Sequence, residues 1–250
     1  MKCIPASSTG SAAWSAEPVP GAAERLDPQG LMLWLARQPA GRGLCIECGA
    51  GRAEIGAFMA RAFGRVIACD IRPVPAPSDA APRNLERRLA PAEAIPADDR
   101  SADLVVSMQA LHFFDRAGHL AEVRRVLRPG GVFAALAWGE MLLPGPVAAH
   151  LAVLTTALAA HWEPARAEVV AGYPDLQCEG RALALPAAAM VRAMTLAGIL
   201  AEISGWSAAR RARAAQADLP EVAPVLPGLT ADARFAVAWP IVGRVFRTAA

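Results

Sequence analysis

The sequence has little net charge and almost no lysine, and both shortages limit the partners it can have. Among 250 residues, 25 basic side chains nearly balance 23 acidic ones, the formal net charge is +2, and lysine occurs only at Lys2. Proteins that hold nucleic acid or an anionic membrane surface by electrostatics carry a clear basic patch. We therefore expect no nucleic-acid partner and no membrane partner. A Walker-type phosphate loop is also excluded, because it requires a lysine beside its glycines.

Long apolar runs are missing as well. No stretch reaches about 20 uninterrupted apolar residues, which is the length that a transmembrane helix requires. Residues 1–21 lack the continuous apolar segment of a signal peptide. An odd number of unevenly spaced cysteines argues against a secreted disulfide framework. These cysteines are Cys3, Cys45, Cys48, Cys69 and Cys178. Together the absences predict a cytoplasmic protein.

Patterns for metal binding and for serine hydrolysis are not present either. Cys45 and Cys48 form a C-x-x-C pair, but an odd offset on a strand sends two side chains to opposite faces. The four histidines show no metal-ligand spacing, so we expect no metal site. The G-x-S-x-G turn of serine hydrolases does not occur.

What the sequence does contain is a regular alternation of apolar strands and helices in its first half. We expect strands at residues 43–47, 66–69, 102–108 and 132–138, helices at 28–38, 54–63 and 119–127, and at 84–89 either a strand or a helix-to-strand passage. Strands that are apolar along their whole length and alternate with helices are typical of a parallel sheet covered on both faces.

The second half departs from this alternation. We expect an N-terminal arm at residues 1–27, flexible or acting as a lid, and one domain at 28–250. Within it, 141–176 reads as a helical insertion after the fifth strand, with helices at 147–162 and 165–170. Residues 177–185, a helix at 190–203, and 233–247 would complete the fold. The arginines at 210–213 are interpreted as a solvated helix face.

A glycine loop and a carboxylate indicate where the chemistry lies. Gly49 and Gly51 follow the first strand and precede a helix, so a ligand can approach the backbone and the free N–H groups of the helix start. Asp70 ends the neighbouring strand, and ligands in open parallel sheets bind beyond these carboxyl ends. A carboxylate there can accept both hydroxyls of a ribose. The pair predicts a nucleoside-bearing cofactor.

The loop favours one cofactor over the others. A dinucleotide fingerprint requires glycine where this chain has Glu54, and a carboxylate beside a pyrophosphate is unfavourable. S-adenosylmethionine has a ribose and a positive centre but no phosphate, and the acidic Glu47 at the loop entrance suits it. NAD is the weaker alternative.

At residues 28–140 the sequence resembles the class I S-adenosylmethionine-dependent methyltransferases. Five segments carry the resemblance in order, at 46–51, 66–70, 90–96, 103–108 and 127–131. More narrowly, residues 109–114 resemble the Q-A-x-H-W-F segment of the trans-aconitate-methyltransferase-like branch, as do 161–164 and 205–207. The resemblance implies a Rossmann-like, doubly wound, mostly parallel seven-stranded α/β sheet, with the helical segment after strand five binding the substrate.

The resemblance also implies roles for matching residues. The cofactor-binding residues would be Glu47, Cys48, Gly49, Ala50, Gly51, Asp70, Ile71, Ala92, Glu93, Ser107 and Gln109. Asp70 would hold the ribose, Ile71 would pack on adenine, and Ala92 would contact the adenine edge through its backbone. Ser107 and Gln109 would lie under the methionine portion. Many relatives have an acidic residue where this chain has Pro91, so another group must bind the adenine amino group.

His112 is the candidate catalytic residue, because it follows the fourth strand and its ordinary pKa lies near neutrality. It would act as a base, orient the acceptor, or only stabilise the turn. The expected substrate contacts are Trp14, His112, Phe113, Trp138, Trp162 and Tyr173. The predicted function is methyl transfer to an oxygen or nitrogen of a small molecule in specialised metabolism, with S-adenosylhomocysteine as product, by a monomer or homodimer. A non-methylating enzyme or binder on the same fold stays open.

Overall fold

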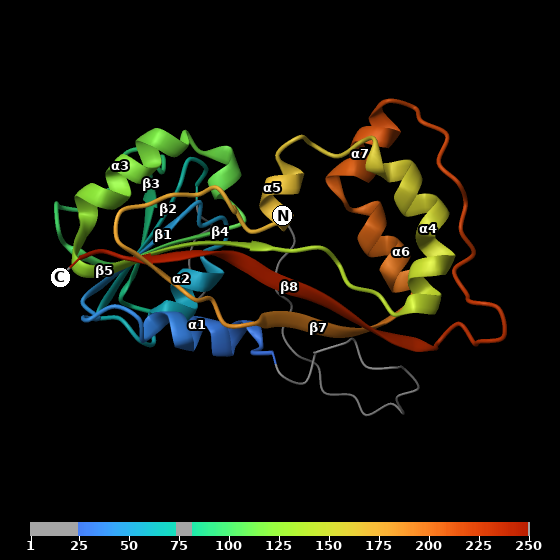
Figure 1. The fold of residues 1–250 in the computed structure, drawn as a ribbon, viewed down its shortest axis with the longest axis horizontal. Helices are drawn as coiled ribbons and strands as arrows, with labels where there is room; N and C mark the ends of the chain where they lie inside the picture. Colours follow the sequence, from blue (N-terminus) through green and yellow to red (C-terminus); the bar gives the residue numbers. More distant parts are fainter. Residues whose placement is uncertain (1–24, 74–81, 250) are drawn as a thin grey trace.

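The computed structural model describes residues 25–73 and 82–249, which form a sheet with helices on both faces (Figure 1). The helices are α1 (Pro28–Ala36), α2 (Glu54–Met59), α3 (Arg116–Val126), α4 (Gly145–Ala159), α5 (Arg166–Val170), α6 (Leu196–Ser204) and α7 (Ser207–Ala214). Helices α1 and α2 cover one face and share a core with it, whereas α3 and α5 cover the other. This is the two-sided covering that the apolar strands predict.

The sheet has the parallel topology of a doubly wound fold. Its strands are β1 (Leu44–Cys48), β2 (Arg65–Asp70), β3 (Leu85–Leu89), β4 (Ala102–Met108), β5 (Leu127–Trp138), β6 (Arg181–Leu183), β7 (Ala188–Thr195) and β8 (Arg234–Arg247). Strands β1 to β5 are parallel, and β8 runs antiparallel to β5. The order is β3-β2-β1-β4-β5-β8-β6, with β7 also paired to β8. The strand order reverses between β1 and β4, so their carboxyl ends form the crevice in which such sheets bind ligands.

The sheet contains eight strands in seven positions, which confirms the expected mostly parallel seven-stranded α/β arrangement with one refinement. Strand β6 pairs with the last part of β8 and β7 with its first part, so both lie along the same side of one long strand. Residues 184–187 separate them. This short segment includes Pro186, which has no N–H to donate to a ladder. Residues 84–89, which the sequence left open, form strand β3.

The helix predicted at 190–203 is wrong in its first part. Residues up to Thr195 belong to β7, whose eight positions pair with β8, and the helix starts only at Leu196. The Thr195 side chain accepts a hydrogen bond from Gly198 N at 3.1 Å, which caps α6 at that point. Met190 and Met194 are good helix formers, but pairing with a distant strand overrides that local preference.

Helices α4, α6 and α7 form a separate group beyond the sheet, above the long ribbon of β7 and β8 (Figure 1). They share an apolar core built from Val147, Leu151, Ile199, Ile203 and Ala208, among others. Helix α5 instead contacts β5. The boundaries 1–27, 28–250 and 141–176 remain predictions. Within the two described ranges, no helix combines the length and apolar character needed to cross a membrane.

Candidate cofactor and acceptor site

The loop after β1 is bound to the end of β2. Gly49 and Gly51 have φ angles of 70° and 53°, a left-handed conformation that glycine adopts at little cost. Ala53 also has a positive φ of 57°, although an alanine there costs about 1–2 kcal/mol. The Ala50 N–H donates to the Cys69 carbonyl at 3.0 Å. The loop therefore has a fixed shape beside the carboxyl end of β2.

Asp70 lies against this loop, as the sequence predicts. One carboxylate oxygen accepts from Gly51 N at 2.9 Å and the other accepts from Arg72 N at 2.9 Å. The side chain is nearly buried, so these two bonds fix its orientation. Each carboxylate oxygen can accept a second hydrogen bond. Asp70 can therefore still receive two hydroxyl groups, which fits a ribose.

Gly49 serves protein packing as well as turn geometry. A Cβ atom at this position would lie 2.4 Å from the Ala110 Cβ and 3.0 Å from the Phe114 ring. The expectation that the missing side chain leaves room for a ligand is wrong for this side of Gly49. The missing side chain lets the turn after β4 pack directly onto the loop, which brings His112 near the site.

Glu47 is buried on β1, where its Oε2 accepts a hydrogen bond from Gly56 N at 2.8 Å. Burial raises its pKa from 4.5 to about 8, and the negative charges of Glu54 and Asp70 add to the rise, whereas the Gly56 bond opposes it. Glu47 is therefore mostly protonated at neutral pH in the free protein. Its side chain is engaged by the α2 backbone rather than directed freely at a ligand.

Cys45 and Cys48 lie in the cores on opposite faces of the sheet, which confirms the argument from their odd offset. Cys48 is fully buried, and its Sγ lies 3.8 Å from the Sγ of Cys69 on β2. Its side chain is not accessible to a cofactor, so only its backbone can contribute. The nearby Ala50 is also buried.

Two apolar side chains stand exposed at the ends of neighbouring strands. Ile71 is 71% exposed and Leu89 is 69% exposed, and Leu89 pairs in register with Asp70. Apolar side chains next to a carboxylate that fits a ribose suit the packing of a planar base. Leu89 was not identified from the sequence. The available signal was an apolar residue at the tip of a strand whose preceding residues, Arg87 and Arg88, are charged.

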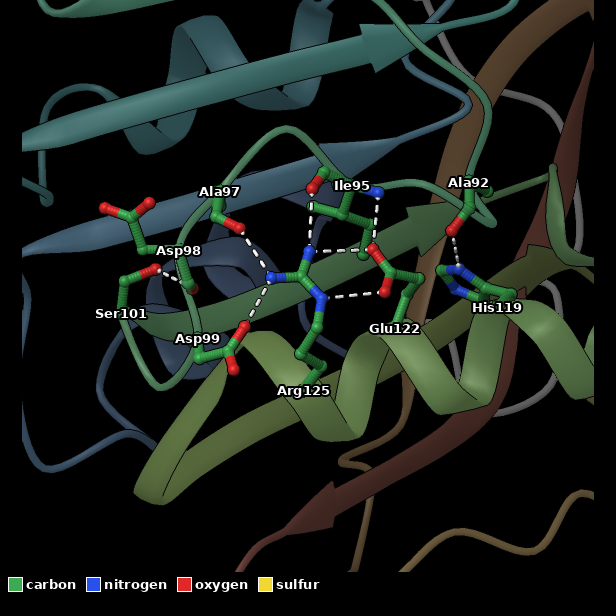
Figure 2. A network of polar contacts seen from close by, with 9 residues as sticks. All are labelled: Ala92, Ile95, Ala97, Asp98, Asp99, Ser101, His119, Glu122 and Arg125. Carbon is green, nitrogen blue, oxygen red and sulfur yellow. Dashed lines mark hydrogen bonds and ion pairs between the residues drawn. The ribbon is translucent and has the colours of Figure 1, made fainter.

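The loop that follows β3 is clamped onto α3 by Arg125 (Figure 2). Arg125 donates to the carbonyls of Ile95 at 2.9 Å and Ala97 at 2.8 Å, and to Asp99 at 2.8 Å. It also pairs with Glu122 at 2.7 Å, and Glu122 in turn accepts from Ile95 N at 2.7 Å. These contacts of Arg125 were not predicted from the sequence. They fix the segment that carries Ala92.

Ala92 is held at the same loop by His119. The ring Nδ1 of His119 lies 2.9 Å from the Ala92 carbonyl and donates to it, because a carbonyl can only accept (Figure 2). Burial lowers the pKa of His119, so the ring is neutral. Glu93, expected beside adenine, accepts instead from Asp115 N at 2.7 Å and thus holds the start of α3.

The tip of β4 contains Ser107 and Gln109. Ser107 is fully buried, and its hydroxyl has no hydrogen-bond partner within the described part of the chain. An unsatisfied buried hydroxyl is costly, so it is a position where a bound polar group stabilises the protein. Gln109 adopts a positive φ of 56° and donates from its N–H to the Leu136 carbonyl at 2.9 Å. This sharp turn directs the chain into the short 3₁₀ helix Leu111–Phe113.

His112 lies half-buried in that short helix. Its Nδ1 is 3.3 Å from the Tyr173 hydroxyl, and its ring centre is 4.0 Å from that of Phe113, which is 80% exposed. Burial lowers the pKa of His112, although Glu163 and Glu168 act in the opposite direction. The ring is therefore neutral at physiological pH.

The other residues predicted to contact the substrate lie in different parts of the fold and differ in burial. Tyr173 is fully buried and its hydroxyl meets His112, and its predicted contact with substrate stays a prediction. Trp138 is partly buried at the end of β5, between the sheet core and the helical group. Trp162 packs on Trp206 with ring centres 5.3 Å apart, and Arg166 lies over its ring. Trp14 lies outside the described residues.

These features define a class of protein, and comparison with known proteins agrees. A family described as methyltransferase domain matches residues 46–135. A solved structure from Anaeromyxobacter dehalogenans, described as a candidate type II methyltransferase, is 32% identical over 90% of this chain and 99% of that chain, with a TM-score of 0.76. An uncharacterized methyltransferase of Mycobacterium tuberculosis is 38% identical over 101 residues, 39% of this chain.

The chain belongs to the class I S-adenosylmethionine-dependent methyltransferases, whose cofactor is the one that the glycine loop and Asp70 predict. The match to the mycobacterial proteins spans 40% of their length. A protein of Dictyostelium discoideum that is described as a candidate methyltransferase is 26% identical over 66% of this chain and 65% of its own length.

Proposed function

We propose that this protein transfers a methyl group from S-adenosylmethionine to an oxygen or nitrogen of a small molecule, with S-adenosylhomocysteine as product. One observation carries the proposal. Asp70 is fixed beside the Gly49–Gly51 loop by backbone hydrogen bonds that occupy one lone pair of each carboxylate oxygen. This leaves acceptor capacity for two ribose hydroxyls at the carboxyl edge of the sheet.

The residues at this edge fit the parts of the cofactor in sequence. Asp70 would hold the ribose, and the exposed Ile71 and Leu89 would pack against the base. Ala92 would offer its N–H to the adenine edge, because His119 already occupies its carbonyl and its N–H makes no hydrogen bond with a described residue. Ser107, with its unsatisfied hydroxyl, would face the methionine end.

The remaining predicted residues at this edge would contact the cofactor through their backbone atoms or at its methionine end. Cys48 and Ala50 are buried and have only backbone atoms to offer. Glu47, Glu93 and Gln109 would lie at the periphery of the bound cofactor, although Glu47 and Glu93 already accept hydrogen bonds from the protein backbone. These are supporting positions rather than the main determinants of binding.

The bound cofactor supplies a methyl group that is already activated by its sulfonium. The protein's task is then to bind the acceptor next to that methyl group, to orient it and to exclude water. His112, on the turn that packs against Gly49, is the polar side chain best suited to orient it. Phe113, Trp138 and Trp162 would form apolar walls, whereas most of the predicted N-terminal arm lies outside the described residues.

Several finer assignments belong to the same proposal. Residues 109–114 support a relationship to the trans-aconitate-methyltransferase-like branch, and the near balance of charge supports a small-molecule acceptor in specialised metabolism over nucleic acid or membrane. The segment 141–176 would contribute to acceptor binding through α5, which ends beside Tyr173. We propose a cytoplasmic monomer or homodimer.

The direct test is transfer of a labelled methyl group. The purified protein is incubated with methyl-labelled S-adenosylmethionine and panels of small carboxylic acids, phenols, amines and heteroaromatic compounds, with total RNA and mixed proteins as separate arms. Label in a small molecule supports the proposal. Label only in RNA or protein contradicts the substrate class. Binding of cofactor with no transfer in any arm indicates the non-methylating alternative, and tighter binding of NAD(H) than of S-adenosylhomocysteine contradicts the cofactor.

A further inference from the structure

Tyr173 is held in a single position by its backbone and by its burial. It follows α5 with a positive φ of 58°, next to Gly172 at 78°, and its N–H donates to the Glu168 carbonyl at 3.0 Å. A left-handed conformation is rare for a bulky side chain and indicates that the surroundings impose it. The ring is fully buried in the core between α3, α5 and the sheet. The phenol therefore has little freedom to turn away from His112.

The Tyr173 hydroxyl has one available hydrogen-bond partner. Across residues 25–73 and 82–249, its only hydrogen bond is with His112 Nδ1 at 3.3 Å. Burial raises the pKa of Tyr173 to about 12, so the hydroxyl keeps its proton. That proton needs an acceptor, and Nδ1 can accept it only if Nδ1 itself carries no proton. If Nδ1 carried the proton, the buried Tyr173 O–H would have no acceptor. The cost of this unsatisfied donor favours the tautomer with the proton on Nε2 by about fivefold or more.

We infer that Tyr173 is a positioning residue that fixes His112 in the tautomer with a proton on Nε2, so that His112 donates a hydrogen bond to the methyl acceptor and does not remove its proton. Only Nδ1 of the half-exposed ring has a described partner, which leaves Nε2–H for the acceptor. This inference rests on the proposed methyltransferase function and specifies the acceptor for it.

The consequence concerns which molecules can be methylated. The acceptor's lone pair forms the new bond to the methyl carbon while the carbon–sulfur bond breaks with its electron pair on sulfur, and no proton passes to the protein. Suitable acceptors therefore have, at neutral pH, a free lone pair besides the one that accepts from Nε2–H, such as an oxygen that is already ionised, or a heteroaromatic nitrogen in a molecule whose other polar atom accepts from His112. An aliphatic alcohol requires a base, and a histidine that already carries its proton on Nε2 cannot serve as one.

The charged groups around the pair do not reverse this assignment. Glu163 and Glu168 favour protonation of His112, but burial outweighs them and the pKa of His112 stays below its ordinary value. Arg116 neutralises Glu168 through an ion pair of 2.8 Å. The ring is thus neutral near pH 7, and its tautomer is the property that decides whether Nε2 donates or accepts.

The test reads the tautomer directly by two-dimensional ¹H–¹⁵N correlation of the histidine rings in the full protein. The chain has four histidines, and His112→Gln identifies the signals of His112 by their loss. We expect wild-type His112 to carry its proton on Nε2, and Tyr173→Phe to produce a mixture of both tautomers. Thr248→Val removes a hydroxyl that bonds to Arg128 and Gly131 at the opposite edge of the sheet and should leave the His112 signals unchanged.

A proton on Nδ1 in the wild-type protein would overturn the inference, even if Tyr173→Phe fails to fold. Unchanged tautomer signals in a folded Tyr173→Phe variant would overturn it as well. This readout needs neither cofactor nor turnover, so it is independent of whether the proposed function is correct, which calorimetric binding of S-adenosylhomocysteine tests separately.

Kinetics give the second readout. Tyr173→Phe should lower kcat about fivefold with unchanged cofactor affinity, and His112→Gln, whose amide still donates, should retain measurable activity. In the His112→Gln background, the Tyr173→Phe change should have no further effect on kcat. A rising limb of kcat near the histidine pKa that disappears in His112→Gln would show proton removal and contradict the inference.

Discussion

The buried carboxyl of Glu47 should make this protein less stable as the pH rises through neutrality. Burial raises its pKa from 4.5 to about 8 in the folded state. Below the unfolded pKa, both states hold the proton and the folded protein has its full stability. Between the two values the unfolded chain ionises while the folded protein does not, so the free energy of unfolding falls, and it levels off above pH 8.

The magnitude follows from the difference between the two pKa values. The folded and unfolded pKa values differ by about 3.5, and one pKa unit is worth about 1.36 kcal/mol, so the total loss of unfolding free energy is about 5 kcal/mol. About 4 kcal/mol of this loss falls between pH 5 and pH 8. Glu47→Gln keeps an oxygen that can accept from Gly56 N but cannot ionise. The variant should therefore lack this dependence and should become relatively more stable than the wild type as the pH rises.

The assay is urea unfolding at pH 5, 6, 7 and 8, with the difference in unfolding free energy between wild type and Glu47→Gln plotted against pH. Glu86→Gln is the matched control, because Glu86 is a partly exposed carboxylate whose pKa is lowered to about 2 by Arg65 and Arg88 and does not titrate in this range. Its difference from the wild type should be constant. A constant difference for Glu47→Gln as well would show that the Glu47 carboxyl does not titrate with a raised pKa in the folded protein.

Two further substitutions test the loop and its clamp. Arg125→Ala removes the contacts to Ile95, Ala97 and Asp99. It should therefore weaken the binding of S-adenosylhomocysteine several-fold and lower the unfolding free energy by about 1–3 kcal/mol. Unchanged affinity by calorimetry would exclude a role of Arg125 in positioning the loop. Gly49→Ala should cost about 2–5 kcal/mol from its positive φ and the overlap with Ala110, whereas Gly145→Ala, which meets no atom within 4 Å, should be nearly neutral in the same unfolding assay.

The parts of the fold that the sequence could predict are those governed by local pattern. Most residues of strands β1, β4 and β5 are apolar because helices cover both faces of the sheet, and that burial is visible in the residues themselves. Strand β7 was missed in favour of a helix because Met190 and Met194 have no local feature of a strand. Their conformation is decided by β8, whose partner residues lie more than 40 positions away in the chain.

In the candidate site too, some contacts can be predicted from the sequence and others depend on tertiary packing. Gly51 and Asp70 could be paired from the sequence because the ends of adjacent parallel strands meet at one edge, and the structure brings them to 2.9 Å. The contact between Tyr173 and His112 joins residues 61 positions apart through α5, and no local pattern encodes it. Glu93 resembled a ligand contact in sequence, but its distance to Asp115 N is set by the docking of α3, which only the packed structure determines.

Calorimetric titration of S-adenosylhomocysteine into the wild-type protein and into Asp70→Ala tests directly whether the carboxyl edge of the sheet binds the cofactor. We expect the wild type to bind with a dissociation constant on the order of 10⁻⁶ M. Loss of the carboxylate that we propose accepts two ribose hydroxyls should weaken binding by roughly 30- to 1,000-fold, or about 2–4 kcal/mol. No binding to the wild type, or equal affinity in a folded Asp70→Ala variant, would contradict the assignment of this edge as the cofactor site.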